Sequence, residues 1–142
     1  MKQELVKNWM TTDVITITPD TSLHDTHRLM TDNNIRRLPV LKEKRLVGIV
    51  TLGDVRGAEP SGATSLSIWE VNYLLAKLNI DEIMHKEVIS TLKVATIEDA
   101  AKIMFENKIS GLPVVDNQDN LIGIITESDI FRLVVNAWHD ED

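Results

Sequence analysis

The sequence contains no cysteine, only 4% aromatic residues and four prolines among 142 residues. Without cysteine, neither disulfides nor thiolate-bound zinc can hold the chain together, so it must fold around an ordinary apolar core. Its longest apolar runs, such as Leu121–Ile125, are far too short to cross a bilayer, and its N-terminus lacks the apolar stretch of a signal peptide. We therefore expect a cytoplasmic protein that is not inserted in a membrane.

Positive charge is also scarce. Fifteen basic residues face 22 acidic ones, a formal net charge of −7, and the basic residues cluster only at Arg36–Arg37 and Lys42–Arg45. No broad cationic surface can form, so duplex nucleic acid is excluded as a partner. A small anionic ligand stays compatible with this charge, because one or two arginines and a helix N-terminus are enough to hold it.

The chain is an internal repeat. A shift of 74 residues, which becomes 75 after one extra residue in the second copy's turn, superposes one half on the other. The matching stretches are Met10–Ile15 with Met84–Ile89, Asn33–Val40 with Asn107–Val114, and Leu46–Thr51 with Leu121–Thr126. Two copies with so long a period indicate two supersecondary units that pack on each other.

Both copies predict the order β-α-β-β-α, and hence an α/β fold. A β-rich stretch comes first, and a capping pair three residues apart then opens a helix with a core-facing stripe. Two strands and a last helix follow. In the first copy the β-rich stretch is Val14–Thr18 and the capping pair is Ser22 with Asp25. The two strands are Leu38–Leu41 and Leu46–Val50, and the last helix starts at Thr51. In the second copy the β-rich stretch is Val88–Thr91 and the capping pair is Thr96 with Asp99. The two strands are Leu112–Val115 and Leu121–Ile125, and the last helix starts at Thr126. The core-facing stripe of this copy's first helix comprises Ile97, Ala100, Ala101, Met104 and Phe105.

An inserted segment separates the copies. Residues 58–64 are predicted to form a loop, and Ser65–Leu78 a helix that carries Trp69 and Tyr73. That pair is interpreted as core packing, a dimer contact or a ridge that binds a partner. The expected organisation is a first repeat over residues 1–60, a linker with the inserted helix over 61–80, and a second repeat over 81–142.

The residues Ile109–Asp116, Ile-Ser-Gly-Leu-Pro-Val-Val-Asp, followed by Leu121–Asp129, Leu-Ile-Gly-Ile-Ile-Thr-Glu-Ser-Asp, resemble the cystathionine-β-synthase (CBS) repeat. The first copy carries the same motif, and the resemblance extends over roughly residues 10–135, with a particular similarity to small stand-alone CBS pairs of the acetoin-utilisation type. It implies a pseudo-twofold Bateman module with two clefts. In that family the clefts bind AMP, ADP, ATP or S-adenosylmethionine, and the module forms a homodimer.

The strand-to-helix junctions support this interpretation independently. Thr51 and Thr126 each end a buried strand where a helix begins, so amide N–H groups and the positive end of the helix dipole should face the cleft and attract an anion. A carboxylate one turn along, Asp54 or Asp129, can accept both hydroxyls of a ribose.

The resemblance also assigns other positions. The first cleft would comprise Ile15, Ile35, Arg36, Ile49, Thr51 and Asp54. The second would comprise Ile89, Ile109, Ser110, Ile124, Thr126, Ser128 and Asp129, together with Arg37 reaching over from the first repeat. The second cleft is expected to be better furnished, because Gly53 replaces Ser128 and Gly111 replaces Arg37 in the first. Asp13 and Glu87 near the ligand-contacting segment would oppose phosphate if they point inward.

Simpler interpretations remain open. Thr-x-x-Asp is also a capping box that stabilises a helix without any ligand, and Arg36–Arg37 can be solvated charge. His24 and His27 lack a third metal ligand, so no metal site is expected.

The leading hypothesis is a regulatory module that senses an adenine nucleotide and changes its repeat and dimer packing on binding. The alternative is a dimeric interaction subunit that binds no ligand and docks an unidentified protein. An enzyme is not expected, since the sequence shows no nucleophile with its base, no metal cluster and no glycine-rich phosphate loop. No cofactor is required.

Overall fold

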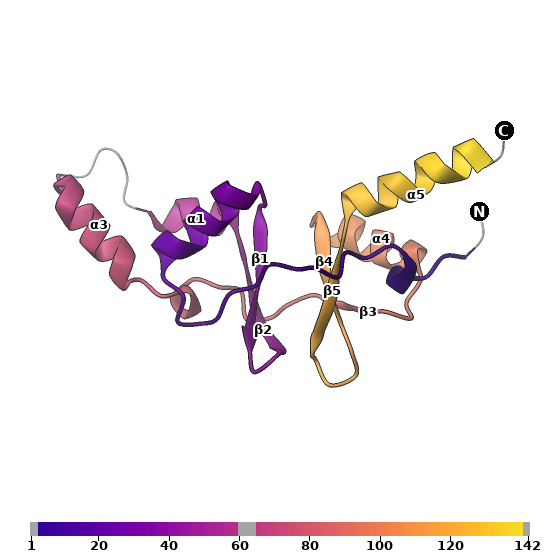
Figure 1. Cartoon of the computed structure of the whole chain (residues 1–142), viewed down its shortest axis with the longest axis horizontal. Helices are drawn as coiled ribbons and strands as arrows, with labels where there is room; N and C mark the ends of the chain where they lie inside the picture. The colour runs from indigo at the N-terminus through magenta and orange to yellow at the C-terminus, as the bar shows by residue number, and fades with distance from the viewer. Residues whose placement is uncertain (1–2, 60–64, 141–142) are drawn as a thin grey trace. The chain divides into compact units, whose positions relative to one another are not determined.

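The computed structural model describes residues 3–59 and 65–140 (Figure 1). It forms two compact units, one of Ile15–Val88 and the other of Met1–Val14 together with Ile89–Asp142. We call them the first-repeat unit and the second-repeat unit. The units do not follow the sequence order expected for the repeats, because the residues that lead into each repeat pack with the other one. Residues 60–64 of the expected linker lie outside the described residues.

The first-repeat unit is a β-hairpin covered by helices (Figure 1). Helix α1 starts where Ser22 Oγ accepts a hydrogen bond from Asp25 N (3.1 Å) and ends at Asn34 in the left-handed region, with φ of 52°. The hairpin turns through Glu43 and Lys44, both at positive φ. Its elements are α1 (Leu23–Asn33), β1 (Arg37–Lys42), β2 (Arg45–Thr51), α2 (Leu52–Ala58), α3 (Ile68–Lys77) and the short 3-10 helix η2 (Ile80–Glu82).

The second-repeat unit repeats this design with one more strand. Strand β3 pairs in parallel with β4, and β4 pairs antiparallel with β5. A core of buried side chains from α4, the strands and α5 includes Met104, Leu112 and Ile125. Its elements are η1 (Val6–Asn8), β3 (Thr91–Leu92), α4 (Ile97–Asn107), β4 (Gly111–Val115), β5 (Leu121–Thr126) and α5 (Glu127–Asp140).

The α/β class and the two repeats are confirmed, but four details of the expected elements were wrong. Residues 14–18 form no regular strand, because only Ile17 bridges to Val40 of β1. The matching strand of the second copy covers Thr91–Leu92 rather than Val88–Thr91. Helix α3 begins at Ile68, three residues later than expected. Phe105 does not face the core: its side chain is 85% exposed.

The inserted helix α3 leaves its large side chains in solvent. Trp69 is 80% exposed and Tyr73 is 59% exposed, which excludes core packing within this chain as their role. None of the helices in the two described stretches is long and apolar enough to cross a membrane.

Candidate functional site

The first repeat's candidate site begins where β2 ends and α2 starts. Thr51 keeps an extended backbone, so its hydroxyl accepts a hydrogen bond from Asp54 N at 3.1 Å. The carboxylate of Asp54 accepts in return from Thr51 N at 2.9 Å, which completes a capping box. The predicted pair therefore forms, and the capping role of these two residues is real.

The second repeat has the same junction in a more enclosed form. Asp129 Oδ2 accepts from both the N–H (2.9 Å) and the hydroxyl (3.2 Å) of Thr126. The Asp129 side chain is 11% exposed, against 23% for that of Asp54. Asp129 is therefore the less accessible of the two carboxylates.

Some of the amide groups expected to face a ligand are already bonded within the protein. Leu52 N donates to Arg36 O at 2.7 Å, and Glu127 N donates to Ser110 O at 3.0 Å. Asp54 N is held by the hydroxyl of Thr51. The residue just before β1 or β4 thus fixes the start of the following helix with its backbone carbonyl, a role that the sequence did not predict for Arg36 and Ser110.

Each aspartate also has a basic partner that the sequence analysis missed. His85 Nε2 lies 3.0 Å from Asp54 Oδ1. Arg132 Nη2 donates to Asp129 Oδ1 at 3.2 Å and to the carbonyl of Trp9 at 3.0 Å, and its guanidinium stacks on the Trp9 ring. Alignment of the repeats pairs His85 with Thr11 and Arg132 with Gly57. At each of these two aligned positions, one repeat has a basic residue and the other an uncharged one. This difference was the signal that the sequence offered.

The bonds at Asp54 change its ionisation. Burial raises the pKa of this carboxyl, but hydrogen bonds from the N–H and hydroxyl of Thr51 and from His85 more than offset it, so the pKa lies below its usual 3.8. Asp54 is therefore a carboxylate at neutral pH.

The residues leading into the repeats cross the sheet at a glycine. We call Trp9–Thr12 and Ile83–Lys86 the lead-in segments. Thr11 exchanges two backbone hydrogen bonds with Ile124, and His85 does the same with Ile49. A Cβ on Gly123 would lie 2.9 Å from Thr11 O, and one on Gly48 would lie 2.5 Å from Met84 Sδ. These close crossings place His85 beside Asp54 and Trp9 beside Arg132.

The other predicted residues divide between the two units. Ile15, Ile35 and Ile49 are half-buried in the first-repeat unit, where Arg36 is exposed. In the second-repeat unit Ile109, Ser110 and Ile124 are half-buried, whereas Ile89 and Ser128 are exposed. Arg37 belongs to the first-repeat unit, so its reach toward the second cleft stays a prediction.

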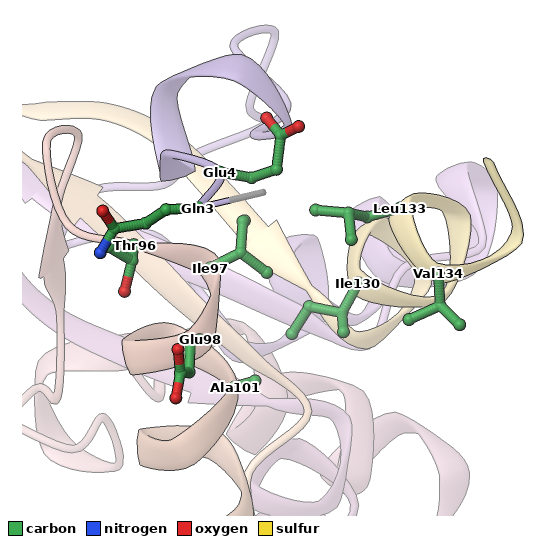
Figure 2. Close-up of a pocket in the computed structure, with 9 residues that line it drawn as sticks. All are labelled: Gln3, Glu4, Thr96, Ile97, Glu98, Ala101, Ile130, Leu133 and Val134. Carbon is green, nitrogen blue, oxygen red and sulfur yellow. The ribbon is translucent and has the colours of Figure 1, made fainter. Parts of the chain in front are cut away.

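Two hollows in the second-repeat unit lie on its helical side. One of about 370 Å³ lies between α4, α5 and the N-terminal segment, and Figure 2 shows Ile97, Ile130 and Leu133 around it with the carboxylate of Glu98 at α4. It contains none of the predicted nucleotide-binding residues. The other, about 820 Å³ and more open, is lined by residues including Ile109, Glu127 and Phe131. No group of three metal-ligating side chains occurs in the parts of the chain that the structure describes.

Solved structures with the same fold include CBS pairs with ligands. The CBS pair of protein MJ0100, in complex with 5′-methylthioadenosine and S-adenosyl-L-methionine, is 30% identical, with a TM-score of 0.78, 96% of this chain covered and 99% of that one. CBSX2 of Arabidopsis thaliana, in complex with AMP, is 26% identical with a TM-score of 0.80, and 94% and 98% are covered. AcuB of Vibrio cholerae is 30% identical with a TM-score of 0.80, and 99% and 98% are covered.

The chain spans less than half the length of the curated relatives that it matches, 47% of one and 22% of another. These longer relatives include enzymes, among them inosine-5′-monophosphate dehydrogenases. The CBS domain family itself matches residues 6–61 and 80–136, which are the two repeats. The resemblance seen in the motifs is thereby confirmed, and the chain belongs to the CBS domain family as a tandem pair of repeats.

Proposed function

We propose that this CBS pair is a regulatory module that binds an adenine nucleotide, AMP, ADP or ATP, or S-adenosylmethionine. The observation that carries the proposal is the doubled junction in which a threonine and an aspartate meet at the start of α2 and of α5. Relatives of the same fold were solved with AMP, S-adenosylmethionine and methylthioadenosine, which all contain adenosine.

The proposed roles follow from the chemistry of each group. Asp54 and Asp129 accept the ribose hydroxyls through the lone pairs left over from the capping bonds. The half-buried isoleucines of each unit supply an apolar surface for adenine. Ser110 and Ser128 donate to phosphate oxygens, Thr51 and Thr126 hold the two aspartates in place, and Arg36 and Arg37 supply positive charge. No catalytic role is assigned to any of these residues.

The number of proposed ligand-binding groups favours the second cleft, whereas the exposure of the aspartate favours the first. The second repeat has the additional serine and, as proposed, Arg37, whereas the first has the carboxylate that is more exposed. We propose that both clefts bind, and that single substitutions rank them.

Isothermal titration calorimetry with AMP, ADP, ATP and S-adenosylmethionine tests the proposal. Asp54→Asn and Asp129→Asn keep the side-chain shape and an acceptor for the capping N–H but remove the charge that a ribose diol prefers. Each should weaken binding at its own cleft about tenfold or more, the magnitude of losing a charged hydrogen bond, and the double variant should weaken binding at both clefts.

The matched control is Asp99→Asn. Asp99 also stands three residues after a capping threonine, Thr96, at the start of α4, yet its side chain is exposed and it is not one of the proposed site residues. It should bind like the unaltered protein. Absence of heat with all four ligands at millimolar concentration would refute the proposal, as would equal losses in Asp99→Asn and the site variants.

We also propose that the chain forms a homodimer through the outer face of α4 and α5. Phe105 and Phe131 stand on this face, 85% and 65% exposed, beside the 820 Å³ hollow. Together they offer roughly 300 Å², against about 800 Å² per partner in a standard interface. The matching positions of the first repeat are Thr31 and Arg56, so a second copy should dock on the second repeat. Phe131→Glu should convert a dimer into a monomer in light scattering, and Arg56→Glu should not.

The alternative, a subunit that docks another protein, has one observation in its favour: the exposed Trp69 and Tyr73 on α3. Under this alternative, replacing both with alanine would release a co-purifying protein while the nucleotide titrations stay silent.

A further inference from the structure

The two aspartates of the proposed nucleotide sites contact basic side chains of different kinds. His85 Nε2 contacts Asp54 Oδ1 at 3.0 Å in the first-repeat unit, and Arg132 Nη2 contacts Asp129 Oδ1 at 3.2 Å in the second. An arginine stays charged at every pH a protein experiences, whereas histidine is the side chain that changes charge between about pH 5 and 8. One carboxylate therefore has a permanent counter-charge and the other a switchable one.

The difference is built into the repeats. At the lead-in position that carries His85 the other copy has Thr11, and at the helix position that carries Arg132 the other copy has Gly57. The backbones at both lead-in positions are held alike, since Thr11 and His85 each exchange two hydrogen bonds with the middle of the neighbouring strand. In the first repeat, therefore, the basic residue beside the aspartate comes from the lead-in segment, because helix α2 has Gly57 where α5 has Arg132.

His85 is placed to act on a bound ligand. Its side chain is 60% exposed, so it contacts Asp54 with one edge and solvent with the rest. Asp54 is the carboxylate assigned to the ribose, and a 5′-phosphate lies only a few bonds from a ribose hydroxyl. An imidazolium at this position would lie within Coulombic range of the phosphate.

We propose that His85 is a ligand-selecting residue of the first repeat's site, and that its protonated form, favoured at lower pH, neutralises Asp54 and favours a phosphate-bearing ligand. The second repeat's site, with Arg132, has no such dependence. The inference rests on the proposed function, because it names the group that selects the ligand's charge at one of the two sites.

The charges around His85 are consistent with a simple two-state switch. Asp54 on α2 is the charged group in contact with the imidazole, and its lowered pKa keeps it ionised through the range in which histidine titrates. Lys86 and Glu87 follow on the same segment and are both exposed, with opposite charges. Just before β1, the carbonyl of Arg36 accepts a hydrogen bond from Leu52 N, and the side chain of Arg36 is exposed. Protonation therefore changes the site by one unit of positive charge.

The experiment uses Asp129→Asn as a background, so that the second site is weakened and the tighter binding measured is that of the first. ADP binding is measured by calorimetry at pH 8.0 and pH 6.0 in this background, with and without His85→Gln. The phosphates of ADP also gain protons over this range. The change in ADP affinity between pH 8.0 and pH 6.0 is therefore compared between the protein with His85 and the protein with His85→Gln. A single charge near a phosphate at a partly exposed site changes affinity about threefold to fivefold. With His85 present, ADP affinity should therefore rise between pH 8.0 and pH 6.0 by that factor more than it does in His85→Gln.

Two further measurements separate charge from packing. Adenosine, which has no phosphate, should show the same pH dependence with and without His85→Gln. His85→Arg, a fixed cation, should bind ADP at pH 8.0 as tightly as the histidine protein does at pH 6.0. Thermal melting of each variant confirms that it is folded, and backbone pairing with Ile49 should hold the segment in place.

Each outcome decides the matter. An identical pH effect on ADP with and without His85→Gln overturns the inference while leaving the proposed function intact, since nucleotide still binds. Loss of all binding in Asp129→Asn alone also overturns it, because the first site would then be silent. If no nucleotide binds even the unaltered protein, the proposed function fails and the inference fails with it.

Discussion

The close crossing at Gly123 makes a sharp prediction about stability. A Cβ added there would meet Met10 Sδ at 2.8 Å, Thr11 O at 2.9 Å and Met10 Cγ at 3.2 Å. The methionine can rotate away, but the carbonyl of Thr11 accepts from Ile124 N at 2.9 Å while Thr11 N donates to Ile124 O at 2.8 Å. The lead-in segment can therefore make room only by stretching both hydrogen bonds.

The expected cost follows from these contacts. Overpacking costs about 1–3 kcal/mol, and each weakened hydrogen bond adds up to about 1 kcal/mol. Replacing glycine in a strand returns about 0.5–1 kcal/mol of backbone entropy. Gly123→Ala should thus destabilise the protein by about 2 kcal/mol, which lowers the melting temperature by roughly 6 °C for a chain of this size.

Urea denaturation followed by circular dichroism measures the change, and two glycines serve as references. At Gly48 the nearest contacts are to the flexible Met84 side chain, with His85 O at 3.2 Å, so Gly48→Ala should cost less than Gly123→Ala. Gly57 is helical with nothing within 4 Å of a Cβ, so Gly57→Ala should stabilise by about 0.5–1 kcal/mol. Unchanged stability in Gly123→Ala, or the order of Gly48 and Gly123 reversed, would show that the lead-in segment does not cross where we place it.

Three other predictions concern single features. Glu43 and Lys44 form the hairpin turn at positive φ, so Glu43→Asn with Lys44→Gly should raise stability by about 1 kcal/mol in the same urea assay; a loss would mean that the turn is of another type. The hydroxyl of Thr96 caps α4 through Asp99 N at 3.0 Å, so Thr96→Ala should cost about 1 kcal/mol and Thr96→Ser almost nothing. Because the pKa of Asp54 is lowered on folding, this carboxyl stabilises the fold above its unfolded pKa and the contribution is lost as the pH falls below 3.8. Asp54→Asn should therefore show a flatter acid limb in melting temperature against pH, and an unchanged limb would contradict the assignment.

The sequence predicted most helices and strands because their signals are local. Helix α4 starts with a cap at Thr96 and ends at Lys108 in the left-handed region, and the equivalent Asn34 ends α1 in the same way. Residues 14–18 were expected to form a strand for their β-branched composition, but strand formation needs a partner edge. Ile17 finds one only between Pro39 and Leu41, and the rest of the stretch pairs with nothing regular.

Exposure was harder to predict than periodicity. The stripe on α4 placed Phe105 with Met104, yet Met104 is 3% exposed and Phe105 85%. Periodicity reports the apolar face of a helix, and it does not separate the part that faces the chain's own core from the part left for a partner. An apolar stripe wider than the core requires leaves apolar side chains in solvent, as Phe105 on α4 does.

The candidate site shows the same limit from its polar side. Thr51 with Asp54 and Thr126 with Asp129 were predictable because a three-residue spacing at a helix start brings the two groups together. His85 is 31 residues from Asp54, and the carbonyl of Trp9 is 123 residues from Arg132, so no local pattern connects them. Arg132 stands three residues after Asp129 on α5, a local spacing, whereas only the comparison of the repeats singles out His85, which stands where the other copy has Thr11. The shared motif makes the two sites alike. Positions at which the repeats differ, such as His85 and Arg132, are therefore where we expect the two sites to differ in their response to pH and to ligand charge.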